Sequence, residues 1–161
     1  LGRLFTRQEI GNDVTVYNNI LGQLDGTGLS AGDKRREIDW ALGLVGLRDK
    51  ADLPGIDLNS FERRLTDVAK CLVGNPRIMM FDEPAGGLSS DETERLGNLI
   101  ATIPSQTGAK VLVIDHDVDL IAKICAETLV LDFGERIAFG KTTEILKDPK
   151  VRAAYLGLEE V

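Results

Sequence analysis

The sequence predicts an α/β protein whose first half is helical and whose second half alternates short parallel strands with helices. Up to about residue 73, apolar residues recur at helical spacing. From residue 77 onward, short apolar runs alternate with helix-like segments, a pattern typical of right-handed parallel strand–helix–strand units. The length of 161 residues, with 43% hydrophobic and 28% charged residues, is sufficient for a globular protein with its own core.

Three helices are predicted in the first half, over residues 15–24, 33–47 and 60–72. Each has one apolar face, and Asn59 or Ser60 can cap the start of the third. We expect Trp40 to anchor the core or an interface between subdomains. The residues predicted to face the core are Val16, Ile20, Leu24, Ile38, Ala41, Leu42, Val45, Leu65, Val68, Ala69 and Leu72.

Four strands are predicted in the second half, over residues 77–82, 110–115, 128–132 and 135–139. The helix after the first strand opens with the capping-box pattern of Ser89 and Glu92 and runs toward Pro104. The run KVLVID is apolar along most of its length, so we expect this strand to be buried on both faces of a sheet.

Charge and cysteine content narrow the class of protein. The net charge of −7 argues against nucleic acid as a partner, because backbone binding needs a basic surface, but it leaves nucleotide binding open. Cys71 and Cys125 lie in apolar surroundings without metal-ligand spacing, which indicates a reducing, cytoplasmic compartment. No apolar stretch approaches the roughly 20 residues of a membrane-spanning helix.

Polar side chains follow two of the predicted strands at the points where they end. Asp82 and Glu83 come directly after one apolar run, and Asp115, His116 and Asp117 come after another. In open parallel sheets, ligands bind beyond the carboxyl ends of the strands. If the two strands are neighbours, the only histidine of the chain lies close to this acidic pair.

Taken from the residues alone, the acidic pair has three interpretations: a cation site, an acid/base pair, or a strand end that reaches water. One carboxylate can hold a hard cation such as Mg²⁺, and the second can orient or deprotonate an attacking water. A histidine facing the same space can hydrogen-bond a terminal phosphate. Together, the two strand ends favour a site for phosphoryl transfer to water.

Two stretches resemble the nucleotide-binding subunit of ATP-binding cassette (ABC) transporters. "NPRIMMFDEPAGGLSSDE" is similar to its Walker B strand and D-loop, and "KVLVIDHDVDLI" is similar to its H-loop. "GERIAFGKTTEILKDPKVRAAYLG" resembles the tail of branched-chain amino acid importer ATPases and their lipopolysaccharide-export relatives. The resemblance covers residues 1–157 and is most specific from residue 74 onward. It implies a partial P-loop NTPase (RecA-like) parallel sheet with helices, plus an ABC-type α-helical subdomain.

The resemblance also implies a division of the chain. Residues 1–14 would be the Q-loop region, 15–73 the helical subdomain ending in a degenerate signature helix, 74–140 the α/β part with Walker B, D-loop and H-loop, and 141–161 a C-terminal helical tail. Residues 85–89 would form the D-loop, which faces a partner subunit in this family.

The same resemblance implies roles for individual residues, with ATP and Mg²⁺ as ligands. Asp82 would support Mg²⁺ through water, Glu83 would be the general base, and His116 would contact the γ-phosphate. The further residues implied to contact ATP are Gln8, Asn59, Ser60 and Glu62. The implied partners are a second ATPase subunit and membrane permease subunits, at the cytoplasmic face of the plasma (inner) membrane.

Several positions depart from the family pattern. The chain contains no GxxxxGK[ST] loop, which in the family lies upstream of the region matching Leu1, so we expect this chain to be part of a longer protein. Thr6 stands where the Q-loop glutamine is expected, and Gln8 follows two residues later. The signature reads LNSFE, with Phe61 in place of its second glycine, and we expect the ring to obstruct a phosphate there. Ser89 replaces the usual Asp or Asn of the D-loop.

These features favour an importer ATPase that powers uptake of small solutes such as branched-chain amino acids. The alternative is a degenerate ABC domain that binds nucleotide in a regulatory or structural role with little hydrolysis. A third class, an ABC ATPase of DNA repair or translation, is disfavoured by the acidic balance and the importer-like tail. An intact Walker B beside an altered signature predicts an asymmetric dimer. Without a covering strand and helix, the sheet is also expected to expose an apolar surface.

Overall fold

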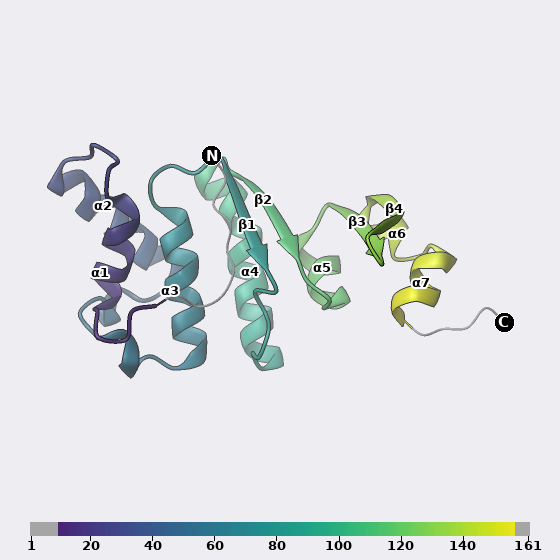
Figure 1. The fold of residues 1–161 in the computed structure, drawn as a ribbon, viewed down its shortest axis with the longest axis horizontal. Helices are drawn as coiled ribbons and strands as arrows, with labels where there is room; N and C mark the ends of the chain where they lie inside the picture. The colour runs from purple at the N-terminus through teal and green to yellow at the C-terminus, as the bar shows by residue number, and fades with distance from the viewer. Residues whose placement is uncertain (1–9, 157–161) are drawn as a thin grey trace. The chain divides into compact units, whose positions relative to one another are not determined.

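The structure is a computed structural model that describes residues 10–156 of the chain. The chain divides into two compact units, one ending at Ile114 and the other beginning at Asp115 (Figure 1). Within residues 10–156, no helix combines the length and the apolar character needed to cross a membrane.

The first unit begins with the predicted helices. They are α1 (Val16–Leu21), continued by the 3₁₀ turn η1 (Gly22–Leu24), then α2 (Ala31–Val45) and α3 (Ser60–Leu72), with short 3₁₀ turns η2 (Arg48–Lys50) and η3 (Gly55–Asp57) between the last two. The hydroxyl of Ser30 caps α2, which therefore starts two residues earlier than predicted. Gly46, at a φ of 76°, ends the same helix in the left-handed conformation that glycine adopts readily.

The core of this helical part is the predicted one. All the apolar residues that helical spacing placed on the inward faces of these helices are buried. Trp40 differs, because it is 37% exposed and therefore does not anchor the core. The inward face of α2 is set by Ile38, Ala41, Leu42 and Val45, and residue 40 lies on another side of the helix.

A parallel strand pair completes the first unit. Strand β1 (Ile78–Asp82) pairs with β2 (Lys110–Ile114) from Ile78 opposite Lys110 to Asp82 opposite Ile114. Helix α4 (Ser90–Thr107) connects them, and its capping box of Ser89 and Glu92 forms as predicted. This helix includes Pro104 in its last turn and ends at Gly108, whose N–H donates to the Pro104 carbonyl.

Only one face of the β1–β2 pair is covered within the described residues. Met79 and Phe81 are fully buried, as are Leu96, Ile100 and Ile103 of α4, which lies along the strands (Figure 1). The opposite face exposes Ile78, Leu112 and Ile114. The expectation that β2 is buried on both faces is therefore wrong for the described structure, because no second layer covers it. The exposed apolar surface expected for an uncovered sheet is present.

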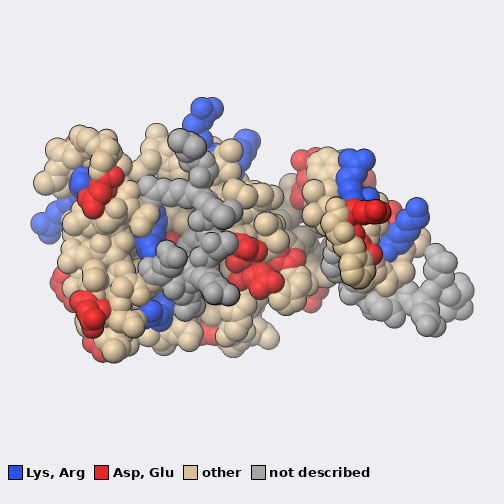
Figure 2. All heavy atoms as spheres, viewed as in Figure 1, with Lys and Arg blue, Asp and Glu red and all other residues tan. Residues whose placement is uncertain are grey.

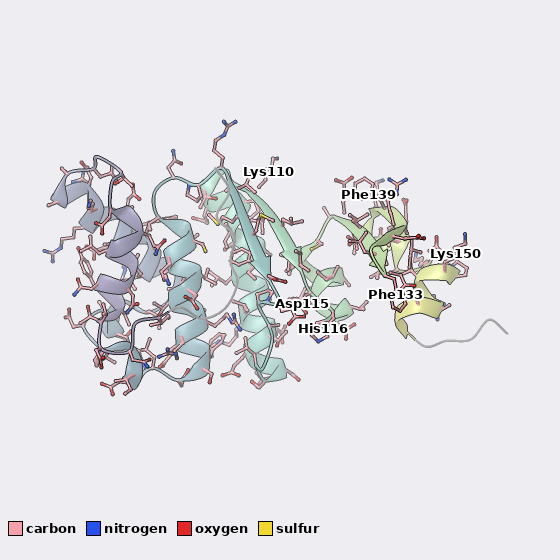
Figure 3. The ribbon with its side chains drawn as sticks, viewed as in Figure 1. Lys110, Asp115, His116, Phe133, Phe139 and Lys150 are labelled. Carbon is pink, nitrogen blue, oxygen red and sulfur yellow. The ribbon has the colours of Figure 1, made fainter. Side chains whose placement is uncertain are left out.

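The second unit is a small helix-covered hairpin. Its elements are α5 (Val118–Ile124), the antiparallel strands β3 (Glu127–Asp132) and β4 (Glu135–Lys141), α6 (Thr142–Ile145) and α7 (Pro149–Leu156). Val130, Ile145 and Val151 form its buried core. Phe133 and Gly134 both have positive φ, as a two-residue hairpin turn requires. The two strands expose the side chains of Leu129, Leu131 and Phe139, and Figure 3 labels Phe139.

The capping box of α4 gives a stability prediction. Ser89→Ala removes the side-chain oxygen that accepts from the Glu92 N–H, so we expect the free energy of unfolding of the intact protein to fall by about 1 kcal/mol. Urea unfolding measures this loss. The matched control is Ser90→Ala, an exposed first-turn position that we expect to change stability by less than about 0.5 kcal/mol. Equal losses in the two variants would contradict the capping role.

Candidate functional site

The predicted acidic pair lies at the carboxyl end of β1. Asp82 is the last residue of the strand and is half-buried, whereas Glu83 is exposed. The Glu83 N–H donates to the Ile114 carbonyl at 2.7 Å, which ties the residue to the end of β2. Figure 2 shows acidic side chains at the surface where β1 ends. The two carboxylates are thus presented at the edge of the sheet where a ligand is expected.

Glu83 has an unusual backbone conformation. Its φ is 46°, in the left-handed region that side chains other than glycine rarely adopt, at a cost of about 1–2 kcal/mol. A residue before proline normally prefers extended backbone, so the sequence Glu83–Pro84 does not predict this conformation. Strained residues held by their surroundings cluster at functional sites, which makes Glu83 a functional candidate on structural grounds as well.

A tight turn follows the acidic pair over residues 83–89. The Gly86 N–H donates to the Glu83 carbonyl at 3.1 Å, and the Leu88 N–H donates to the Ala85 carbonyl at 3.1 Å. Gly87 has a φ of 77°, which its lack of a side chain allows. Hydrogen bonds within the turn therefore hold the backbone that follows Glu83, and the Glu83 N–H ties the turn to β2.

The side chains at this edge of the sheet fit Mg²⁺ only if water and a bound nucleotide supply the other ligands. The described residues contain no group of three or more His, Cys, Asp or Glu side chains that could hold a metal ion. Mg²⁺ is commonly held by one or two carboxylates together with water and substrate phosphates. The single half-buried carboxylate of Asp82 therefore fits an ion shared with a nucleotide rather than a site built by protein ligands alone.

The predicted histidine belongs to the second unit, in the segment between β2 and α5 (Figure 3). The side chain of His116 is 77% exposed, and its Nδ1 lies 3.7 Å from Oδ1 of Asp115, whose side chain is only 2% exposed. The same Oδ1 accepts the Asp117 N–H at 3.0 Å. Asp117 in turn caps α5 by accepting the Leu120 N–H. A carboxylate beside Nδ1 helps to orient the imidazole ring.

The predicted nucleotide contacts of the signature lie together at the start of α3. The Asn59 side chain accepts the Glu62 N–H at 2.9 Å, and the Glu62 carboxylate accepts the Asn59 N–H at 3.1 Å. Ser60 is the exposed first residue of the helix. Glu62 also pairs with Lys50, and this bond is the largest cause that lowers the pKa of Glu62. Gln8, the remaining predicted contact, lies outside the described residues.

Phe61 does not lie where the sequence-based argument placed it. Its side chain is buried, and the guanidinium carbon of Arg95 lies 4.8 Å from the centroid of its ring. The ring therefore packs against α4 beneath a cation instead of covering the exposed start of α3. The expectation that the Phe61 ring obstructs a phosphate is therefore wrong for this structure.

Sequence reasoning missed a buried charged group on α3. Arg64 is 8% exposed and Asp67 is 1% exposed, with Lys70 Nζ at 3.4 Å from Asp67 Oδ1. Burial raises the pKa of Asp67, and Lys70 opposes that shift. The spacing of these residues by three places them near the apolar face, and this was the clue available in the sequence.

Solved structures identify the fold. An ATP-binding cassette of an ABC transporter, MJ1267, in its ADP conformation, matches with a TM-score of 0.77 at 20% identity, covering 98% of this chain and 68% of that one. The cbiO1 protein of Clostridium perfringens, part of the ABC transporter complex cbiONQ, matches with a TM-score of 0.79 at 24% identity, covering 91% of this chain and 59% of that one. The predicted α/β fold class is confirmed: it is that of an ATP-binding cassette.

Sequence relatives identify the family. The high-affinity branched-chain amino acid transport ATP-binding protein LivG of Salmonella typhimurium is 32% identical over 171 residues, covering 96% of this chain and 67% of the relative. The methionine import ATP-binding protein MetN 1 of Acinetobacter baylyi is 27% identical over 163 residues, covering 100% of this chain and 46% of the relative. The family model described as branched-chain amino acid ATP-binding cassette transporter matches residues 135–161. The chain belongs to the ABC transporter ATP-binding protein family and spans about half the length of its methionine import relatives.

The Glu62–Lys50 pair gives a pH-dependent prediction. A carboxyl whose folded pKa is lowered below its ordinary 4.5 contributes stability that is present above that value and is lost as the pH falls through the folded pKa. Glu62→Gln should therefore lower the urea midpoint of the intact protein at pH 7, and the difference from wild type should shrink steadily below pH 4.5.

Lys50→Met supplies the control for this prediction. It removes the largest cause of the shift while leaving the capping box with Asn59 in place. The double variant should lose little more than either single variant, since both remove the same pair. A difference between wild type and Glu62→Gln that stays constant from pH 7 to pH 3 would contradict the argument.

Proposed function

We propose that the protein is the ATP-binding and ATP-hydrolysing subunit of an ABC transporter that imports small solutes such as branched-chain amino acids. The observation that carries the proposal is the acidic pair of Asp82 and Glu83, held against β2 at the end of β1. The similarity to LivG, together with the family model over residues 135–161, supports branched-chain amino acids as the cargo class.

In this proposal, the two carboxylates have separate roles. Asp82 would hold Mg²⁺ through water, together with the phosphates of ATP. The ion would supply positive charge that neutralises the phosphate oxygens. Glu83, which is exposed, would act as general base by accepting the proton of the attacking water. The exposed ring of His116 would hydrogen-bond the γ-phosphate.

The remaining predicted contacts would serve the nucleotide of a second ATPase subunit. Helix starts such as that of α3 favour anions, because the helix dipole places partial positive charge there. Ser60 is exposed there, whereas the side chains of Asn59 and Glu62 are engaged in the capping box. Gln8 would act from the Q-loop region. Membrane permease subunits would complete the assembly, at the cytoplasmic face of the plasma membrane.

A second candidate function is nucleotide binding in a regulatory or structural role with little hydrolysis. The observation that favours it is the signature itself, which has Ser60 and Phe61 where the family has glycines. This candidate keeps the same Asp82 site and differs from the first only in turnover.

Substitution of Glu83 separates the two candidates. In the intact protein, Glu83→Gln should lower ATP hydrolysis by about 100-fold or more, because it removes the proton acceptor, while ATP binding is retained. Phosphate release and equilibrium ATP binding measure the two effects. Glu135→Gln, an exposed glutamate at the start of β4, is the matched control and should hydrolyse ATP like wild type. Wild-type hydrolysis that survives Glu83→Gln would refute the assigned base, and absent wild-type turnover would favour the regulatory function.

The altered signature predicts dependence on a partner. The intact protein alone should hydrolyse ATP slowly, and addition of an ABC ATPase subunit that carries an unaltered LSGGQ signature should raise the rate, since each site in this family combines motifs from two subunits. A steady-state assay across a titration of candidate partner ATPases measures the effect. Full activity of the protein as a homodimer would contradict an asymmetric pair.

A further inference from the structure

The buried charges of α3 are not explained by packing alone. Arg64 is 8% exposed, and its Nε has no hydrogen-bond partner among residues 10–156. Oδ2 of Asp67 likewise lacks one within that range. Burying a guanidinium is unfavourable unless it is bonded, so a buried Arg at this position points to a specific contact.

That contact is with the turn behind the candidate base. Nη2 of Arg64 donates to the Gly86 carbonyl at 3.4 Å. The Gly86 N–H donates to the Glu83 carbonyl, and the Glu83 N–H donates to the Ile114 carbonyl. These three hydrogen bonds form a continuous path from α3, through the backbone of Glu83, to the end of β2, all within the first unit.

The neighbouring side chain holds the same face of α3 against α4. Phe61, one turn before Arg64, lies beneath the guanidinium of Arg95 from α4. The helix therefore contacts both the turn over residues 83–89 and the helix that the turn leads into. The Arg64 side chain donates to the turn itself, and the residue that it bonds, Gly86, also donates its own N–H to the Glu83 carbonyl.

We infer that Arg64 is a positioning residue that holds the turn over residues 83–89, and with it the strained backbone of Glu83, in place. In this role Arg64 acts through its contact with the Gly86 carbonyl. The left-handed Glu83 would otherwise relax toward a more favourable φ, which would move its carboxylate. The catalytic consequence rests on the proposed function, whereas the positioning contact does not.

Hydrogen exchange of the intact protein, read by mass spectrometry, tests the contact directly. Arg64→Met should speed exchange across residues 83–89 by about 10-fold, because the Gly86 carbonyl loses its donor. Where ATP is hydrolysed, kcat should fall by about 10-fold or more with the KM for ATP little changed, since misplacement of the base affects the chemical step. Arg64→Lys keeps the charge and a hydrogen-bond donor. Its exchange rate over residues 83–89 and its kcat should both lie between those of Arg64→Met and wild type.

Arg63→Met is the matched control. Arg63 precedes Arg64 on the same helix but donates to the Gly55 carbonyl at 2.6 Å and to Asn12 Oδ1 at 3.0 Å. Its removal should speed exchange near Gly55 and leave residues 83–89 unchanged.

Unchanged exchange over residues 83–89 in Arg64→Met would overturn the inference. So would a rise spread evenly over the first unit that Arg64→Lys reproduces, because that result marks a general packing role. If Arg64→Met does not fold, exchange over residues 83–89 is compared between Arg64→Lys and Arg63→Lys. Faster exchange there in Arg64→Lys alone supports the inference, and equal rates overturn it. A wild type without ATP hydrolysis would defeat the proposed function alone, since the exchange result stands without it.

Discussion

The hydrogen bond from the Glu83 N–H to the Ile114 carbonyl extends the parallel β1–β2 ladder one residue beyond β1. The local arrangement around the candidate site follows from this bond. It holds a non-glycine residue at positive φ, directs the chain into the turn over residues 83–89, and places Asp82 opposite the last residue of β2. Without it, the acidic pair would be an ordinary strand end in water.

Helix α3 also supports the turn that follows the acidic pair. Helix α3 is fixed at its start by the capping box of Asn59 and Glu62 and is joined to the loop before it by Lys50. Phe61 and Arg64 then connect it to α4 and to the turn. The segment that resembles a degenerate signature is therefore a well-formed helix start with an inward anchor, and its departure from the family pattern changes packing as well as surface chemistry.

The sequence allowed much of this architecture to be predicted, for physical reasons. Helices were found because Ile38, Leu42 and Val45 recur at the helical period, and their starts were found because Ser89 and Glu92 can satisfy each other's backbone locally. Properties that depend on distant neighbours were not predictable. The exposed face of β2 depends on which layers pack on the sheet, and the inward ring of Phe61 depends on Arg95, which lies 34 residues later (95 − 61).

The same limit applies to the site. Carboxylates at a strand end are visible in the sequence, and so is their expected chemistry. The backbone of Glu83 is not, because a residue before proline favours extended φ, and it is the bonds to Ile114 and Gly86 that oppose this preference here. Burial of Arg64 and Asp67 has only the helical spacing as a clue, and that clue is outweighed because charged residues are normally assigned to solvent.

Because Glu83 has a positive φ, the residue type that favours folding stability at this position differs from the one that the proposed activity needs. Glycine adopts this conformation without a steric cost, so by folding stability alone residue 83 would be better filled by glycine, by about 1 kcal/mol. A glutamate there is the less stable choice for the backbone and the one that carries a carboxylate. Selection for a more heat-resistant variant of this protein would therefore tend to remove the very side chain on which its proposed turnover depends.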